Sequence, residues 1–137
     1  MCIRDSIHSI LAARIGKVEK AYQLFMHATR LDLDDYNNEG EQGLHITSMP
    51  GSWLAIVRGF AGLQIVNDML KIEPVLPEKW NSYSFKVNYS GSTLHIQVSK
   101  EIKIGLTAGN KLNIQVYQNV YELKQGLDLT VNRKDLS

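Results

Sequence analysis

The sequence DLDDYNNEGEQGLHITSMPGSW, residues 32–53, separates two parts of the chain that have different hydrophobic periods. Before it, apolar residues recur every three or four positions as in amphipathic helices, and after residue 62 they alternate with polar residues as in strands. The stretch itself is polar and glycine-rich, which is typical of a loop. Because a loop of this length inside a helical region is usually functional or disordered, and this one contains Tyr36, His45 and Trp53, we interpret it as functional.

Two helices are predicted before this loop. Residues 7–15 have the helical spacing of apolar side chains, and the pattern stops at Gly16. Residues 17–31 repeat the pattern, and the break at Gly16 predicts that the two helices pair in antiparallel fashion. The expected apolar face of the second helix consists of Val18, Ala21, Tyr22, Phe25 and Ala28.

A third helix is predicted to begin at the end of the loop. Ser48 precedes Met49 and Pro50, the arrangement of an N-cap residue followed by a proline in the first helical turn. Gly59 and Gly62 are expected to weaken and then end this helix. Its apolar stripe, which we expect to be buried, consists of Trp53, Ile56, Val57 and Phe60.

The period changes from 3.6 to 2 at Leu63, and the rest of the chain predicts short strands. Asn67 and Asp68 lie between the first two apolar runs and suit a tight hairpin turn. Residues 73–80 contain two prolines and predict an extended connector, whereas the polar residues 124–137 are expected to fray. Further strands, separated by glycine turns, are predicted within residues 82–89, 94–98, 102–106, 112–116 and 121–123. Together they indicate an antiparallel β-sandwich with one buried face per sheet.

The composition of the 137-residue chain excludes several classes of function. With 15 basic and 14 acidic residues, a formal charge of +1 and no block of like charge, the sequence argues against binding to nucleic acid or to an anionic membrane as the main function. It contains neither a run of about 18 apolar residues nor a recognisable signal peptide, so we expect no membrane span. The single Cys2 allows no internal disulfide and fits a reducing compartment, the cytoplasm.

The first six residues, MCIRDS, look like a translated sequencing adapter. We therefore expect residues 1–6 to be non-native and the chain to be a C-terminal piece of a longer protein. Three helices with one apolar stripe each cannot surround a core of their own, so we expect an apolar helix face to be open to solvent. The predicted division is an adapter-like segment (1–6), a helical part (7–62) and a β part (63–137).

His45 is the strongest candidate for a functional side chain. It lies just before a predicted helix N-terminus, where backbone N–H groups and the helix dipole favour an anion. A histidine, the hydroxyl of Ser48 and a helix N-terminus would together make a phosphate-binding site. From spacing alone, however, a lone loop histidine is more simply interpreted as a structural residue that makes hydrogen bonds.

The other polar clusters carry weaker signals. The acidic residues Asp32, Asp34, Asp35 and Glu39 lack the spacing of a calcium loop, and Asp32 and Asp34 are expected to hydrogen-bond to loop backbone. The remaining histidines, His8, His27 and His95, are scattered, so no metal site is predicted. Trp80 could form a sugar platform with Tyr83 and Tyr89, but these aromatic residues are better explained by packing, because both tyrosines alternate in phase with Phe85 and Val87.

The ordered combination LDLDDYNNE, GLHITSM and GSW within residues 30–62 resembles the end of the catalytic barrel in the maltose phosphorylase branch of glycoside hydrolase family 65. Residues 7–25 look like the preceding helix pair of that family, and residues 76–99 are similar to its small C-terminal β-sandwich. The resemblance covers residue 7 to about residue 123. It implies an α+β fold made of the last helices of an (α/α)6 barrel followed by a small antiparallel β-sandwich.

The resemblance also implies an activity, the inverting cleavage of maltose by inorganic phosphate to β-glucose 1-phosphate and glucose. His45 in GLHITS matches the phosphate-binding histidine of the family, and Ser48 is a further candidate ligand. The general-acid glutamate lies upstream of this sequence, so no catalytic residue is assigned and the piece alone is expected to be inactive.

The implied partners are a disaccharide and phosphate, without a cofactor, in a homodimeric cytoplasmic protein. Trehalose phosphorylase, kojibiose phosphorylase, a hydrolase of the same family and a non-catalytic carbohydrate-binding β-sandwich remain alternatives.

Overall fold

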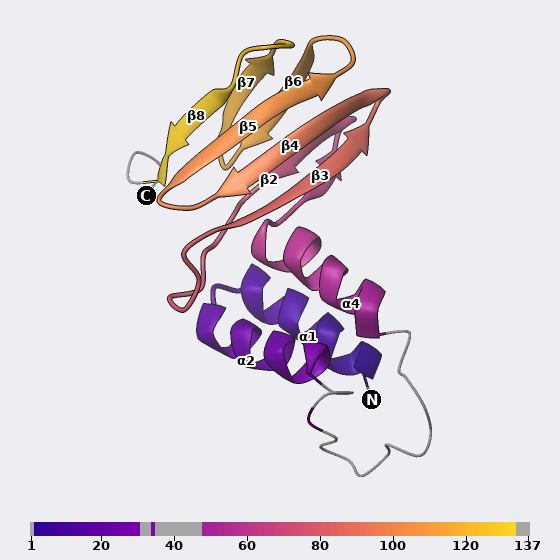
Figure 1. Ribbon diagram of the computed structural model, residues 1–137, viewed down its shortest axis with the longest axis vertical. Coiled ribbons are helices and arrows are strands. Elements are labelled where there is room, and N and C mark those ends of the chain that lie inside the picture. The colour runs from indigo at the N-terminus through magenta and orange to yellow at the C-terminus, as the bar shows by residue number, and fades with distance from the viewer. Residues whose placement is uncertain (1, 31–33, 35–47, 134–137) are drawn as a thin grey trace. The chain divides into compact units, whose positions relative to one another are not determined.

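The computed structural model describes residues 2–30, 34 and 48–133, with residues 2, 3 and 48 described by their backbone alone (Figure 1). The chain divides into two compact units, residues 1–62 and residues 63–137. The described part of the first unit is helical, and the second consists of two sheets. The α+β fold class predicted from the change of hydrophobic period is confirmed.

The helical unit contains α1 (Cys2–Arg14), α2 (Val18–Thr29), α4 (Ser48–Leu54) and the π-helical turn η2 (Ala55–Phe60) that continues α4. Gly16, with φ +78°, reverses the chain between α1 and α2, which form the antiparallel pair expected from the sequence. Residues 2–6, set aside as adapter-like, lie in the first part of α1, where Ser6 is buried.

The core of the helical unit is built around one aromatic pair. The rings of Phe25 and Phe60 meet edge to face with centroids 5.7 Å apart, and both side chains are buried. Ser9 satisfies its buried hydroxyl by donating a 2.8 Å hydrogen bond to the carbonyl of Ala21. The rest of this core is formed mainly by small side chains, which allow the helices to approach closely: Ala12, Ala13, Ala21, Ala28, Ala55, Val57 and Ala61.

The predicted apolar stripe of the third helix is wrong at Trp53, which is 50% exposed, and at Ile56, which is only half-buried. The prediction assumed 3.6 residues per turn throughout. In the structure the backbone N–H of Ala61 donates to the carbonyl of Ile56, an i→i+5 bond that adds a residue to the turn. Residues 53 and 60 therefore no longer share one helix face.

Gly59 was predicted only to weaken the helix, but in the structure it has a role in packing. A Cβ atom at this position would lie 3.2 Å from the Cα atom of Ile10, so the absence of a side chain allows η2 to approach the backbone of α1. Gly62 follows with φ +61° and ends the helix, as the sequence predicted.

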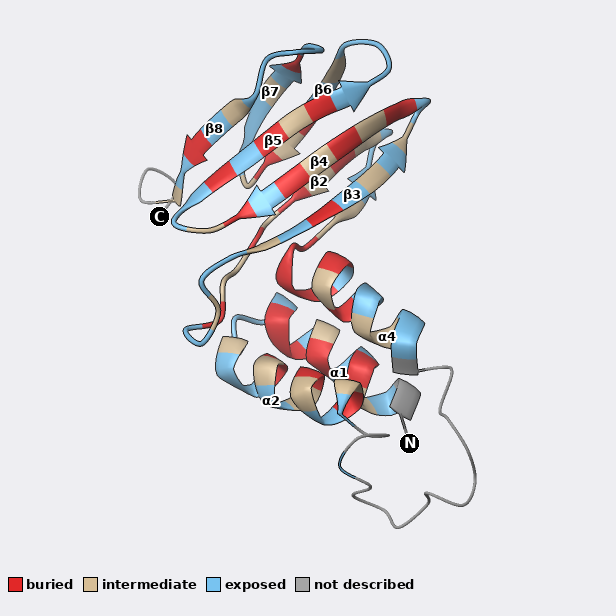
Figure 2. Ribbon diagram, viewed as in Figure 1, coloured by how far each residue is buried: buried red, intermediate tan, exposed pale blue. Residues whose placement is uncertain are grey.

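The helical unit has the open apolar face expected from its sequence. Ile7, Leu11 and Ile15 are 49–69% exposed and recur every four residues, so they form one stripe along α1 and the residue that follows it. Met49 and Trp53 form a similar exposed pair on α4, whose described residues are exposed or intermediate in Figure 2. Large apolar side chains gathered in this way are typical of a surface that another part of a protein covers.

The second unit is a β-sandwich of two four-stranded sheets with the strand orders β1-β2-β6-β7 and β3-β4-β5-β8. Most neighbours are antiparallel, as predicted, but β2 and β6 pair in parallel. Side chains alternate between the two faces of a strand whichever way its neighbour runs, so the alternation in the sequence could not reveal this exception. The strands are β1 (Gln64–Val66), β2 (Met69–Ile72), β3 (Tyr83–Tyr89), β4 (Ser92–Val98), β5 (Glu101–Ala108), β6 (Leu112–Val116), β7 (Asn119–Leu123) and β8 (Leu129–Asn132).

The core of the sandwich follows the alternation read from the sequence. Every second residue is buried along β4 and along β5 as far as Leu106, as the alternating colours in Figure 2 show. The predicted hairpin turn is also confirmed, because Asn67 and Asp68 both have positive φ and connect the antiparallel strands β1 and β2. The largest fully buried side chains of this core are Leu70, Ile72, Leu94, Ile96, Ile102, Ile104, Ile114 and Leu123.

The expectation that residues 124–137 fray is wrong for part of this segment. Residues 129–132 form β8, which pairs with the edge of β5 and buries Val131. The strand is only four residues long and contributes one buried side chain, so its hydrophobic signal is weak. Its stability depends on hydrogen bonds to a partner strand that is distant in sequence.

Tyrosine hydroxyls hold the proline-containing connector between β2 and β3. The hydroxyl of Tyr117 donates to the carbonyl of Pro74, and that of Tyr83 donates to the carbonyl of Val75 at 2.9 Å. Trp80 packs edge to face on Tyr83, with ring centroids 5.7 Å apart. The hydroxyl of Tyr89 likewise donates to the carbonyl of Asp68. Packing, rather than a sugar platform, therefore explains these aromatic residues.

The β unit is predicted to lose stability at alkaline pH, because the Tyr83 hydroxyl that contacts the connector loses its proton more readily in the unfolded chain. Burial, with a smaller contribution from nearby Tyr117, raises the pKa of Tyr83 above its ordinary value of 10.0. Because the folded state holds this proton more tightly, the stabilisation is complete below the unfolded-state pKa of about 10 and is lost as pH rises above it. For Tyr83 the loss approaches about 1.4 kcal/mol per pH unit.

Urea unfolding followed by Trp80 fluorescence between pH 8 and 11, in a Trp53→Phe background, measures this dependence. Tyr83→Phe should be less stable at pH 8, because it loses the hydrogen bond to Val75, but it should show a flatter decline above pH 10. An equally steep decline in both proteins would contradict the assignment.

Candidate functional site

The main predicted ligand, His45, lies outside the described residues, as do Asp32, Asp35 and Glu39. The backbone of Ser48 is described, and it is the first residue of α4 rather than the residue before the helix. The described part of the candidate site consists of the residues that flank segment 35–47. On one side these are the end of α2, Arg30 and Asp34, and on the other side the beginning of α4.

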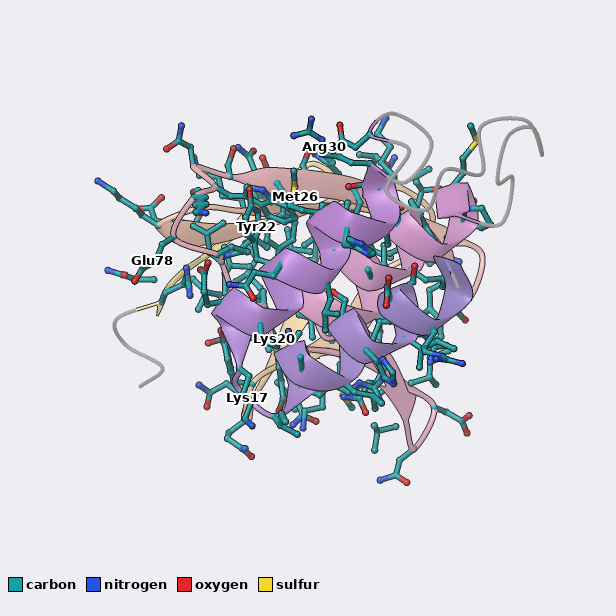
Figure 3. All side chains as sticks on the ribbon, turned by 90° about the horizontal axis from the view of Figure 1, so that it is seen from below. Lys17, Lys20, Tyr22, Met26, Arg30 and Glu78 are labelled. Carbon is teal, nitrogen blue, oxygen red and sulfur yellow. The ribbon has the colours of Figure 1, made fainter. Side chains whose placement is uncertain are left out.

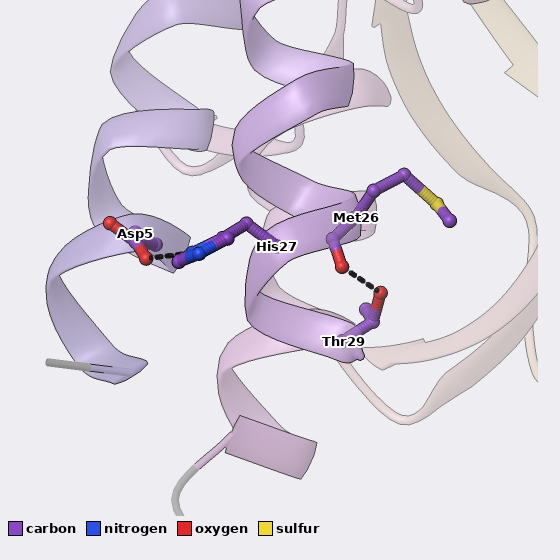
Figure 4. Close-up of polar contacts among 4 residues, drawn as sticks. All are labelled: Asp5, Met26, His27 and Thr29. Atoms are coloured by element: carbon purple, nitrogen blue, oxygen red, sulfur yellow. Dashed lines mark hydrogen bonds and ion pairs between the residues drawn. The ribbon is translucent and has the colours of Figure 1, made fainter. Parts of the chain in front are cut away.

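Contacts with α1 place the two flanks of this segment at one end of the helical unit. Near the end of α2, Nδ1 of His27 lies 2.7 Å from Oδ2 of Asp5 in the first turn of α1 (Figure 4). Near the start of α4, a Cβ atom at Gly51 would lie 2.6 Å from Oγ of Ser6. Because residues 5 and 6 are adjacent, the end of α2 and the start of α4 both lie beside the beginning of α1.

The end of α2 is stabilised by local polar contacts. Thr29 donates a 3.1 Å hydrogen bond to the carbonyl of Met26, one of the carbonyls that a helix end leaves without a partner (Figure 4). Arg30 contacts Asp34 through two pairs of atoms, Nε to Oδ2 and Nη2 to Oδ1, both at 2.9 Å. A bidentate pair of this kind restrains the direction in which the chain leaves α2.

The carboxylate of Asp34, which is predicted to bond to loop backbone, also pairs with Arg30 four residues earlier. The i, i+4 spacing of Arg30 and Asp34 is visible in the sequence and could have revealed this pair. The contact between Asp5 and His27 joins residues 22 positions apart, so no local pattern could have revealed it.

The beginning of α4 has the electrostatic character of an anion site. Together α4 and η2 make a continuous helical segment of residues 48–60, whose N-terminal N–H groups and dipole give a partial positive charge. The first turn contains no acidic residue that would neutralise this charge. Pro50 lies within that turn and is tolerated there because N–H groups in this position lack a helical acceptor.

Basic side chains lie in or directly beside α2 at both of its ends. Figure 3 shows Lys17 and Lys20 at the beginning of the helix and Arg30 at its other end, with Tyr22 and Met26 between them. Of these three cations, only Arg30 lies at the end of the unit where α4 begins. Arg30 is already paired with Asp34, so it would contribute only part of its charge to an anion bound there.

The described residues contain neither a metal-binding cluster nor a helix that could span a membrane. Within residues 2–30, 34 and 48–133, no group of three or more histidine, cysteine, aspartate or glutamate side chains lies close enough to bind a metal ion. In the same part of the chain, none of the helices has both the length and the apolar character that crossing a membrane requires.

Two family models match the chain, and together they cover most of it. Residues 2–54 match the glycosyl hydrolase family 65 central catalytic domain, and residues 63–123 match the C-terminal domain of the same family. The chain belongs to glycosyl hydrolase family 65. The resemblance identified from the sequence is thus confirmed, and the two matches fall in the two structural units of this family 65 chain.

Known members of family 65 with similar sequences are phosphorylases. The chain is 46% identical to maltose phosphorylase from Bacillus subtilis (strain 168) over 85% of its length, and 40% identical to alpha,alpha-trehalose phosphorylase from Geobacillus stearothermophilus over 95%. A solved structure named "Putative kojibiose phosphorylase from human microbiome" superposes with a TM-score of 0.89 at 42% identity. That superposition covers 97% of this chain and 20% of the other. The chain spans about a sixth of the length of the two curated relatives, 16% and 17% respectively.

Proposed function

We propose that this family 65 chain is the C-terminal part of an inverting disaccharide phosphorylase that cleaves maltose with inorganic phosphate to β-glucose 1-phosphate and glucose. The observation that carries the choice of substrate is the 46% identity to a maltose phosphorylase, compared with 40% to trehalose phosphorylases and 31–38% to kojibiose phosphorylases. The C-terminal part alone is proposed to be inactive, because the acid catalyst belongs to residues that precede this sequence.

The helical unit is proposed to be the last part of an (α/α)6 barrel. Two observations support this proposal. The unit matches the central catalytic domain of the family, and its exposed stripe on Ile7, Leu11 and Ile15 is the kind of surface that neighbouring barrel helices would cover. In that arrangement residues 7–62 complete the catalytic domain and residues 63–137 form the accessory β-sandwich. Residues 1–6 remain an adapter-like segment in this proposal.

The phosphate site is proposed to consist of His45, Ser48 and the beginning of α4. The helix N-terminus supplies backbone donors and a positive dipole without a competing acidic residue in its first turn. His45 reaches this point along the chain within three residues of Ser48. A phosphate dianion would favour the protonated imidazole, which then donates a charge-assisted hydrogen bond.

This arrangement would serve an inverting reaction in which phosphate replaces the water and the general base of an inverting hydrolase. A carboxylic acid of the barrel protonates the glycosidic oxygen on one side of the sugar, and phosphate attacks the anomeric carbon from the opposite side. The C–O bond to phosphate forms as the bond to the leaving glucose breaks. The role of His45 and the α4 N-terminus is to hold the nucleophile in line and to orient its charge.

A specific observation keeps kojibiose as a second candidate substrate, since the structure named for that activity superposes over 97% of this chain. Trehalose is a third possibility, supported by the 40% identity to trehalose phosphorylases. A hydrolase of the same family, or a carbohydrate-binding β-sandwich without catalytic activity, would require that the phosphate site is not used. The full-length protein is further proposed to be cytoplasmic and homodimeric and to need no cofactor besides its co-substrate phosphate.

The test is an assay of the full-length protein, recovered from the gene that contains this sequence. Maltose, trehalose and kojibiose are each supplied with and without inorganic phosphate, and glucose 1-phosphate and its anomeric configuration are measured. Phosphate-dependent release of the β-anomer from maltose is the expected result. Glucose release that is independent of phosphate would indicate a hydrolase, and no turnover of any of the three sugars would favour the binding module.

A further inference from the structure

A surface depression lies in the β unit, whereas the residues of the proposed phosphate site belong to the helical unit. Its volume is about 360 Å³, near the lower end of the range for small-molecule sites. It lies where the chain leaves β7 in one sheet and enters β8 in the other, the crossover visible in Figure 1. The residues that line it are Glu122, Leu123, Lys124, Leu127, Asp128 and Leu129.

The wall of this depression is held in place by backbone contacts. The N–H of Leu127 donates to the carbonyl of Lys124 at 3.2 Å, and Gly126 has φ +79°, so residues 124–127 form a tight turn. Gln125 makes a bridge to Leu106 of β5 in the second sheet. The turn is therefore attached to both sheets.

Asp128 is placed at the depression by a specific packing arrangement. A Cβ atom at Gly105 would lie only 2.6 Å from Oδ1 of Asp128, so the carboxylate occupies space that any other residue at position 105 would fill. The structure shows no hydrogen bond or ion pair to the Asp128 carboxylate from the described residues. This carboxylate is therefore free to accept hydrogen bonds from a ligand.

The charges around the depression favour a neutral ligand. Glu122 is paired with Lys124 at 3.2 Å and with Lys111 at 3.7 Å, and these ammonium groups hold the pKa of its carboxyl below the usual range. With acidic and basic groups in balance, neither a phosphate nor a metal cation would be strongly attracted. Leu127, which is 65% exposed, offers an apolar surface beside these polar groups. Hydroxyl groups around an apolar C–H face, as in a glucose ring, match this combination.

We propose that this depression binds a glucosyl unit of a neutral α-glucoside, with Asp128 and Lys124 contacting its hydroxyl groups and Leu127 contacting its C–H face. The choice of an α-glucoside rests on the proposed function. The site would be an accessory one, because the proposed phosphate ligands lie in the helical unit and not among these residues. Its volume admits one or two sugar rings, so it suits a disaccharide or the end of a longer glucan.

The experiment is a titration of the full 137-residue chain with maltose, followed by ¹H–¹⁵N NMR. Amide signals of residues 122–129 are expected to shift on addition of maltose, and maltoheptaose in a parallel titration distinguishes a disaccharide site from a glucan site. Asp128→Ala should weaken binding about tenfold, the effect of removing a hydrogen bond to a charged group. Leu127→Ala should also weaken it. Glu78→Ala, which removes an exposed carboxylate from the connector (Figure 3), is the matched control and should leave binding unchanged.

Three outcomes would overturn the proposal: no shift at residues 122–129, shifts caused by inorganic phosphate but not by maltose, or unchanged binding in Asp128→Ala. Because catalysis is not measured, these results do not depend on whether the full-length protein is a phosphorylase. Failure of maltose phosphorolysis together with sugar binding here would instead reject the proposed function and leave the accessory site in place.

Discussion

In the full-length enzyme, His45→Ala is expected to raise the Michaelis constant for phosphate about a hundredfold, the scale of removing one preorganised donor to an anion in an active site. The physical reason is the loss of a charge-assisted hydrogen bond beside a helix N-terminus that cannot hold the dianion alone. The Michaelis constant for maltose should change little, because the sugar is bound by other parts of the barrel. Initial rates measured over a matrix of phosphate and maltose concentrations separate the two constants.

His95→Ala is the matched control for this experiment. It removes an imidazole from β4 in the β unit, which contains no residue of the proposed phosphate site. Both Michaelis constants should therefore stay within about twofold of the parent values, as is usual for substitutions away from such a site. If His45→Ala instead lowered kcat at saturating phosphate and left phosphate affinity intact, the assignment of His45 as a phosphate ligand would be wrong.

Phe60→Ala is expected to destabilise the helical unit by about 3–5 kcal/mol, the usual cost of removing a buried phenylalanine. Phe60 is fully buried and its ring meets that of Phe25, while most of the surrounding core consists of alanines that cannot move to fill the space. The loss should appear in urea unfolding followed by helical circular dichroism. A change below about 1 kcal/mol, as is typical of surface substitutions, would show that this aromatic pair is not the centre of the core.

Ile7→Ala provides the comparison for Phe60→Ala, because Ile7 is equally apolar but 49% exposed in the helical unit. In the isolated chain its removal should cost little. In the full-length protein the same substitution should cost markedly more if the open stripe packs against the rest of a barrel. Equal small effects in both proteins would contradict the proposal that the stripe is covered.

The sequence predicted several elements correctly where the signal was local. The pair α1 and α2 followed from helical spacing interrupted at Gly16, and the β1–β2 hairpin followed from Asn67 and Asp68, two residues that tolerate positive φ. The alternation in β4 and β5 identified the buried residues because one face of each strand is packed and the other is not. These features depend on the backbone preferences of single residues and on the hydrophobic period, and both can be recognised from neighbouring residues.

The failures came where geometry departed from a regular period or depended on distant residues. Trp53 was assigned to the core because an α-helix was assumed, whereas the π-helical turn at residues 55–60 rotates it outward. Strand β8 and the parallel pairing of β2 with β6 were missed because each is stabilised by a partner strand far along the chain. Residue His45 was proposed from a motif, and its role remains a prediction for the kinetic experiment above.

By itself, the sequence determined the family, the α+β class and the separation of a helical part from a β part, since hydrophobic period and the motif in residues 30–62 are local properties. Only the tertiary structure decided which apolar side chains are buried and which strands are neighbours. It also brought the beginning of α1 beside the end of α2 and the start of α4, and it placed Asp128 over Gly105. These arrangements join residues far apart in the sequence, and they are set by close packing and hydrogen bonding in three dimensions rather than by any local pattern.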